Sequence, residues 1–369
     1  MSQAYLVLSD GTTYTGHSFG YSPKNGVEGE VVFNTGMAGY PETFTDPSYR
    51  GQILVTTYPL IGTYGIPDWD AVSQYGLKEY FESDAVHITG LIVSEYQNTP
   101  SHHTSTQSLS EFLTTHKVPA ISGIDTRAIV KKIREKGVMG GKIYVGKLPP
   151  KATQMKFVRD TDTEDLVSQV SIQEVTEYGT GKIRICLPDT GVKLNIIRNL
   201  LSFDTTIIRV PYDYPFMAAR EKGELSFDAL FLPNGPGNPK MNTKLIAEVK
   251  KALDAKIHIF GICLGNQILA LAGGCTTSKL PYGHRGVNQP CMDADTGHCI
   301  ITSQNHGFAV DDKLPKGIKP WFTNLHDGSI EGIQFVNKKA RAVQFHPESF
   351  PGPDDAQYLF KTFIDSINI

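Results

Sequence analysis

The chain has 369 residues, a length that predicts two domains of ordinary size. Hydrophobic residues make up 40% and charged residues 20% of the chain, which excludes a mostly disordered or fibrous protein. With 35 Lys and Arg against 38 Asp and Glu, the net charge is -3, and nothing in it indicates binding to nucleic acid or to an anionic membrane. No apolar run approaches the roughly 20 residues of a membrane helix, and the N-terminus does not resemble a signal peptide. The five cysteines include no CxxC pair, which favours a reduced protein of the cytoplasm.

Short strand-like runs separated by turn residues characterise the first part of the chain. The predicted strands cover residues 5–8, 31–34, 52–56 and 87–94. A helix is predicted after Asp125, a plausible N-cap, and it stops at Gly137. We therefore expect a β-rich α+β domain over residues 1–146. The prolines and polar residues that follow predict a linker over residues 147–181, with room for a short helix.

Strands and helices alternate from residue 182 onwards. The expected strands are 183–187, 206–210, 229–232 and 258–262, and the expected helices are 192–201, 244–253 and 264–272. This alternation predicts an α/β domain over residues 182–369, in which helices flank both faces of a mainly parallel sheet. Functional sites in such sheets form at the carboxyl ends of the strands.

Cys263 lies between a predicted buried strand and a predicted helix, with Gly261 and Gly265 on either side. Small residues at these positions permit a tight turn that lifts the thiol above the sheet, as in the G-x-S-x-G turn of serine hydrolases. The start of the following helix favours the thiolate, which is the nucleophilic form. Judged by residue type alone, a buried structural cysteine is the more common interpretation. The surrounding pattern favours a nucleophile, and we expect the other four cysteines to be packing residues.

His346 directly follows another strand-like run, and Glu348 comes two residues later. A histidine can serve a thiolate as acid and base, and a carboxylate can orient the imidazole. Taken alone, His346 is more simply a turn residue, but together with Cys263 the three residues form a reasonable triad. The loop 232–239 contains two glycines and three prolines, and its backbone N–H groups could hold an oxyanion together with that of Leu264.

Four spaced motifs together resemble a class I (triad-type) glutamine amidotransferase domain: NGPGNP at 234–239, GICLGNQ at 261–267, QNHGF at 304–308 and FHPES at 345–349. Two segments of the first domain resemble the N-terminal domain of the carbamoyl-phosphate synthase small chain: FNTGMAGYPETFTDPSY at 33–49 and SGIDTR at 122–127. The resemblance covers nearly the whole chain and implies the class I amidotransferase fold for the second domain.

The resemblance implies a role for each matching residue. Cys263 would be the nucleophile, His346 the acid and base, and Glu348 the group that orients His346. Gly235 and Leu264 match the oxyanion-hole positions of the glutamine site. The remaining glutamine-binding positions are matched by Ser48, Gly237, Gln267, Asn305, Gly307 and Phe308. No metal ligands are expected; the adjacent His102 and His103 have no third ligand nearby in the sequence.

The implied reaction is the hydrolysis of L-glutamine to glutamate and ammonia through a cysteinyl thioester. The implied partner is a separate large subunit, which would receive the ammonia and use ATP and Mg to make carbamoyl phosphate from bicarbonate. This chain itself would need no cofactor and would work in a hetero-oligomer of small and large chains in the cytoplasm. Carbamoyl phosphate feeds both arginine and pyrimidine biosynthesis, and both pathways stay open.

Three alternatives remain at this point: a glutaminase that serves another synthetase, a regulatory subunit without turnover, and a thiol peptidase or esterase. The chain also departs from the family pattern at three positions: Asn266 stands where many relatives have His, Pro233 where Ser is usual, and Asn238 where Asp is usual. His306, inside the QNHGF motif, either shapes the pocket or has a structural role.

Overall fold

The computed structural model describes residues 2–154, 156–157 and 159–367. It divides into two compact units, Met1–Glu164 and Asp165–Ile369. The division falls inside the segment expected to be a linker, and the domain boundaries drawn from the sequence stay predictions. Among the described residues, no helix combines the length and the apolar character that crossing a bilayer requires.

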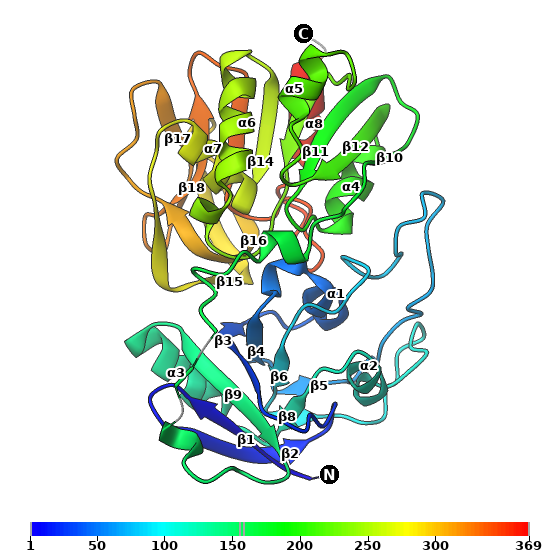
Figure 1. The fold of residues 1–369 in the computed structure, drawn as a ribbon, viewed down its shortest axis with the longest axis vertical. Coiled ribbons are helices and arrows are strands. Elements are labelled where there is room, and N and C mark those ends of the chain that lie inside the picture. The colour runs from blue at the N-terminus through cyan, green and yellow to red at the C-terminus, as the bar shows by residue number, and fades with distance from the viewer. Residues whose placement is uncertain (1, 155, 158, 368–369) are drawn as a thin grey trace. The chain divides into compact units, whose positions relative to one another are not determined.

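The first unit is built around a closed barrel of seven strands (Figure 1). In spatial order these are β1 (Gln3–Leu8), β2 (Thr13–Ser18), β8 (Ala120–Ser122), β6 (Gly90–Ile92), β4 (Gln52–Thr56), β3 (Val27–Asn34) and β9 (Met139–Val145). The other elements are α1 (Tyr40–Thr45), η1 (Pro47–Tyr49), β5 (Leu60–Ile61), β7 (Glu95–Tyr96), α2 (Leu109–Thr115), α3 (Thr126–Lys136) and η2 (Ala152–Gln154). The expected β-rich α+β character is confirmed.

Local signals in this unit correspond closely to the structure. The helix predicted after Asp125 is α3: the Asp125 side chain accepts a hydrogen bond from the backbone N–H of Ala128, and the helix ends at Gly137. The strand expected at 87–94 is shorter, since only Gly90–Ile92 pair with neighbours. Barrel closure was not predicted, because the pairing of β2 with β8 joins segments about a hundred residues apart and leaves no local pattern.

The second unit contains a ten-stranded sheet. Its strands, in spatial order, are β10 (Thr176–Tyr178), β12 (Thr205–Pro211), β11 (Ile183–Asp189), β13 (Ala229–Leu232), β14 (His258–Ile262), β19 (Ala340–Val343), β18 (Ile330–Phe335), β16 (Cys299–Val310), β15 (Thr277–Asp293) and β17 (Ile318–Asn324). The five strands from β12 to β19 in this order are parallel, as expected. The helices are η3 (Val167–Gln169), α4 (Leu194–Leu201), α5 (Phe216–Glu221), η4 (Pro239–Met241), α6 (Thr243–Asp254), α7 (Leu264–Ala272) and α8 (Tyr358–Ile367).

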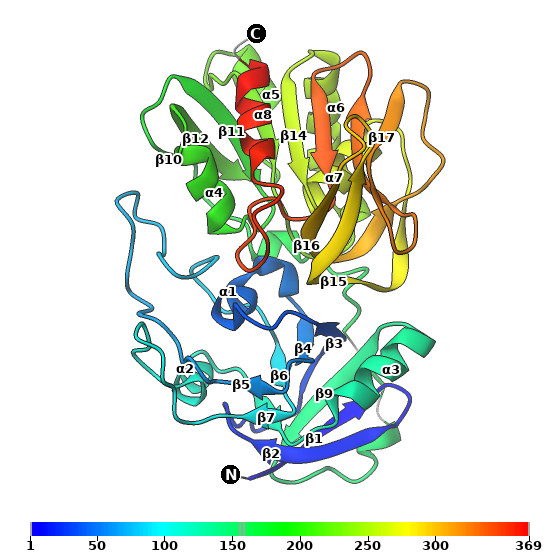
Figure 2. The same ribbon diagram turned by 180° about the vertical axis from the view of Figure 1, so that it is seen from behind.

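Helices cover both faces of the parallel part: α5, α6 and α7 lie on one face, and α4 and α8 on the other (Figures 1 and 2). Successive side chains of β13 point to opposite faces of the sheet and pack against the helices on each face. Leu230 packs in the same apolar cluster as Ile268 of α7, whereas the next residue, Phe231, stacks on Phe360 of α8. The sequence of a strand that is buried on both faces is a continuous apolar run. For this reason β13 and β14 have the bounds that their apolar runs predicted.

The antiparallel part of the sheet was not predicted. β17 pairs with both β15 and β18, so that β18, β16, β15 and β17 close into a ring. The long strand β15 contains Pro281, Gly283 and Pro290, residues that normally mark turns, and its register against β16 shifts twice. An irregular strand of this kind lacks the regular alternation of apolar and polar residues from which a strand is predicted. Its neighbour β16 contains the QNHGF motif, residues 304–308.

Candidate active site

Cys263 lies in the turn between β14 and α7 with φ 54° and ψ -105°, a backbone conformation that non-glycine residues rarely adopt. The turn leaves no room for a side chain at Gly261 or at Gly265. A Cβ at Gly265 would collide with the backbone carbonyl of Leu232, and a Cβ at Gly261 would crowd the backbone of Gly265. Glycine is therefore required on both sides of the thiol, as expected for a strand-to-helix nucleophile turn.

His346 follows β19 and is held from two directions. Its backbone N–H donates to the carbonyl of Ser303 (2.8 Å), and its Nδ1 donates to Oε1 of Glu348 (2.6 Å). Its Nε2 is buried and makes no hydrogen bond to any part of the chain that the structure describes. Burial opposes a charge on this ring, but the Glu348 carboxylate and the Cys263 sulfur outweigh burial and raise the pKa of His346 to about 10. The raised pKa of His346 favours the protonated imidazole at neutral pH.

Lys193 is a functional candidate that the sequence analysis missed. Its Nζ lies 3.0 Å from Oε1 of Glu348 and donates to the carbonyl of Ser349 (2.7 Å). Burial raises the pKa of the fully buried Glu348, but Lys193 and His346 outweigh it and lower this pKa to about 2. The sequence did contain a signal for Lys193. This residue follows the carboxyl end of β11, and functional sites in parallel sheets form at the carboxyl ends of strands.

The loop 232–239 is fixed against the turn after β11. Thr190 Oγ1 donates to the carbonyl of Asn234 (2.8 Å), and the backbone N–H of Lys193 donates to Asn234 Oδ1 (2.9 Å). A Cβ at Gly235 would collide with the carbonyl of Thr190 and crowd the side chain of Leu264. Gly235 and Leu264, the two expected oxyanion-hole residues, therefore lie side by side.

Of the expected glutamine-binding residues in the second unit, Asn305 and Gln267 contact Cys263. Cys263 Sγ lies 3.8 Å from the carbonyl oxygen of Asn305, and Gln267 Nε2 donates to the carbonyl of Phe308 (2.9 Å). Gly307 stands between these residues in β16, and Gly237 (φ 83°) belongs to the loop 232–239. Ser48 lies in η1 of the first unit and is buried, and its place in the glutamine site stays a prediction.

The three departures from the family pattern each have a local role. Asn266 is fully buried and donates through Nδ2 to Gln344 Oε1 (3.1 Å). The carbonyl of Pro233 accepts from Thr190 Oγ1 (3.2 Å), and the Asn238 side chain caps η4. These contacts support the loop and helix around Cys263 without replacing a member of the triad.

Three buried or partly buried side chains, one each on β15, β16 and β18, are of types that can bind metal. Ligand atoms of His284, His306 and Glu331 lie within 4.8 Å of one another. His102 and His103 have their rings 4.3 Å apart on an exposed loop and do not belong to this group. The expectation of no metal in this chain stays a prediction.

Comparison with known proteins gives matches over both units. The model described as "Carbamoyl-phosphate synthase small chain, CPSase domain" matches residues 6–143, and the model "Glutamine amidotransferase class-I" matches residues 186–366. The chain is 43% identical to the carbamoyl phosphate synthase arginine-specific small chain of Saccharomyces cerevisiae, covering 99% of this chain and 89% of that protein.

Longer relatives match as well. The multifunctional protein CAD of Squalus acanthias is 46% identical over 98% of this chain, which spans 16% of that protein. The mitochondrial carbamoyl-phosphate synthase [ammonia] of Mus musculus is 43% identical over 99% of this chain, which spans 24% of it. The chain is thus similar along its whole length to one section of these larger proteins.

Proposed function

The chain belongs to the carbamoyl-phosphate synthase small chain family, and on that premise we propose that it hydrolyses L-glutamine to glutamate and ammonia. The observation that carries the proposal is the buried row Lys193, Glu348, His346 and Cys263. Nε2 of His346 makes no hydrogen bond to the described residues, so this nitrogen can exchange a proton at the sulfur. A thiol nucleophile, an acid and base, and an orienting carboxylate are the groups that amide hydrolysis through a thioester requires.

The first half-reaction uses the proton on His346. The thiolate of Cys263 attacks the side-chain amide carbon of glutamine, forming the S–C bond. Backbone N–H groups beside Gly235 and Leu264 stabilise the resulting oxyanion, and one such donor is typically worth about 10²–10³ in rate. Protonated His346 transfers its proton to the nitrogen, the C–N bond breaks, and ammonia leaves a glutamyl thioester on Cys263.

The second half-reaction uses the same imidazole in its neutral form. His346 removes a proton from water, the water oxygen bonds to the thioester carbon, and the S–C bond breaks. Glutamate leaves, and the thiolate and imidazolium are restored. Glu348 stabilises the imidazolium at the start and end of the cycle, and Lys193 keeps Glu348 ionised in its buried position.

The proposed partner is a large chain that takes up the ammonia and makes carbamoyl phosphate from bicarbonate, with ATP and Mg bound by that chain. No cofactor is proposed for the small chain. The proposed compartment is the cytoplasm, a proposal supported by the five unpaired cysteines, which suit a reducing environment. The product could enter arginine or pyrimidine biosynthesis, and the proposal does not choose between them.

The test is glutamine hydrolysis by the purified chain, alone and with a large chain, ATP and bicarbonate. Cys263→Ala is compared with Cys299→Ala, which removes an exposed thiol at the start of β16. We expect hydrolysis to rise when the partner turns over, and Cys263→Ala to lose a factor on the order of 10⁴ or more. Full activity without the partner would contradict the coupling, and activity that survives loss of Cys263 would contradict the triad.

A further inference from the structure

His306 lies within the segment Asn305–Phe308, which we expect to hold glutamine. Its Nδ1 lies 2.9 Å from the carbonyl oxygen of Phe308. The same carbonyl accepts from Gln267, and the carbonyl of Asn305 lies near the Cys263 sulfur. The ring of His306 therefore contacts the backbone of the segment that is expected to hold glutamine.

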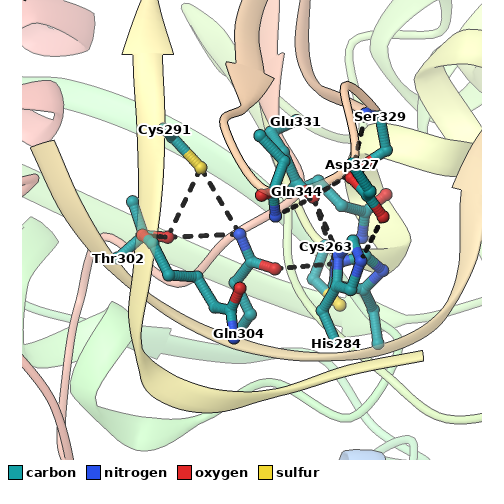
Figure 3. A network of polar contacts seen from close by, with 12 residues as sticks. Cys263, His284, Cys291, Thr302, Gln304, Asp327, Ser329, Glu331 and Gln344 are labelled. Carbon is teal, nitrogen blue, oxygen red and sulfur yellow. Dashed lines mark hydrogen bonds and ion pairs between the residues drawn. The ribbon is translucent and has the colours of Figure 1, made fainter. Parts of the chain in front are cut away.

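The other ring nitrogen of His306 faces oxygen atoms that can only accept. Its Nε2 lies 3.3 Å from Gln304 Oε1 and 3.7 Å from Glu331 Oε1. The Gln304 amide is fixed in this orientation, because its Nε2 contacts Cys291 and Thr302 (Figure 3). Two sets of acceptors thus compete for a proton on His306: the Phe308 carbonyl at Nδ1, and the oxygens of Gln304 and Glu331 at Nε2. Burial lowers the pKa of His306, which favours a ring with a single proton.

Glu331 is fully buried on β18, and its Oε2 makes no hydrogen bond to the described part of the chain. His284 supplies the compensating charge. Its Nδ1 lies 3.0 Å from Glu331 Oε1 and its Nε2 lies 2.9 Å from Asp327 Oδ2, so both nitrogens donate (Figure 3). Burial lowers the pKa of His284, but the two carboxylates outweigh burial and raise it. An imidazolium between two carboxylates offsets the cost of burying Glu331.

We propose that His284 and Glu331 are positioning residues: the His284 cation neutralises Glu331, so that the single proton of His306 stays on Nδ1 and holds the Phe308 carbonyl in place for glutamine. This inference rests on the proposed hydrolysis of glutamine. When His284 loses its charge, Glu331 draws a proton onto Nε2 of His306 and pulls the ring away from Phe308. The groups that face His284 are Glu331, Asp327 and the ring of His306.

The kinetic test uses a rescue. His284→Gln removes the cation, and we expect KM for glutamine to rise about tenfold while kcat changes little, because a charged hydrogen-bond network is weakened. Adding Glu331→Gln removes the competing charge, and KM is expected to return to near the wild-type value. His258→Gln, a substitution on β14 away from this network, is the control. A KM that stays high in the double variant, or does not rise in His284→Gln, overturns the proposal.

A second test does not depend on the folding of His284→Gln. In the wild type, KM should rise with pH as His284 loses its proton, whereas Glu331→Gln should show a flat KM over the same range. Equal pH profiles overturn the proposal.

A third test separates this inference from the proposed function, because it needs no turnover. In ¹⁵N-histidine-labelled protein, Nε2 of His306 should be unprotonated in the wild type and become protonated in His284→Gln. Failure of the wild type to hydrolyse glutamine would contradict the proposed function, and an unchanged His306 spectrum would contradict the positioning role.

Discussion

Two histidine–glutamate pairs in the second unit differ in what binds the second ring nitrogen. His346 binds Glu348 through Nδ1 and keeps Nε2 for the sulfur, whereas His284 binds carboxylates through both nitrogens. A ring with an unoccupied nitrogen can give and take a proton during a reaction, but a ring bound on both sides is held in one protonation state. In this comparison the binding of the second nitrogen, more than the carboxylate, distinguishes the histidine proposed to be catalytic from the one proposed to position the site.

Among the charged partners of the two histidines, the largest effect is expected from Glu348→Gln, which removes the charge that supports the His346 imidazolium. We expect kcat/KM to fall by about 10²–10⁴ because the acid of the first half-reaction is weakened. The raised pKa of His346 means that its proton is present at neutral pH and lost as pH rises towards about 10. In the variant the alkaline limb of the pH–rate profile should therefore move to lower pH.

The control for this variant is Glu177→Gln, which removes an exposed carboxylate paired with Arg184. It should leave both the rate and the pH profile unchanged. An alkaline limb that does not move in Glu348→Gln would show that Glu348 does not set the charge of His346.

An intermediate effect is expected from Lys193→Met. Removing one partner of a buried ion pair leaves Glu348 uncompensated and should lower the free energy of unfolding at pH 7 by about 3–5 kcal/mol, measured by urea denaturation. Glu348 has a lowered pKa, so its contribution to stability is present above the usual carboxyl pKa and lost as pH falls towards about 2. The stability of the variant should therefore depend less on pH over this range.

Lys338→Met is the matched control, because it breaks an exposed pair with Asp254. Exposed pairs typically contribute about 1 kcal/mol or less. If both lysine variants lose the same small amount of stability, the buried pair does not hold the site together.

The smallest effect is expected in the barrel unit, which carries neither histidine–glutamate pair. Asp125→Ala removes the N-cap of α3 and should lower the free energy of unfolding by about 1 kcal/mol. Glutamine hydrolysis by the folded protein should not change. A large loss of hydrolysis with the same small loss of stability would mean that α3 acts on the reaction.

Sequence patterns predicted the elements that carry Cys263 almost completely, since β14 and α7 are marked by an apolar run, two glycines and an amphipathic helix. They did not predict Lys193 or Glu331 as partners. Their contacts join residues far apart in the chain, Lys193 with Glu348 and Glu331 with His284, and a long charged side chain has no local signature of burial. The residues proposed to be catalytic were thus predicted from local context and from the family resemblance, whereas the charged residues beside them became apparent only in the fold.

The ring formed by β15, β16, β17 and β18 also bears on the association of this protein with other chains. β17 would be an open edge of the ten-stranded sheet if it paired with β15 alone, but its second pairing, with β18, occupies the other side. In that sheet, as far as the chain is described, the outermost strand with one neighbour is β10, which has three residues, Thr176–Tyr178. A short edge offers little template for a foreign strand, so this large sheet is protected against edge-to-edge aggregation.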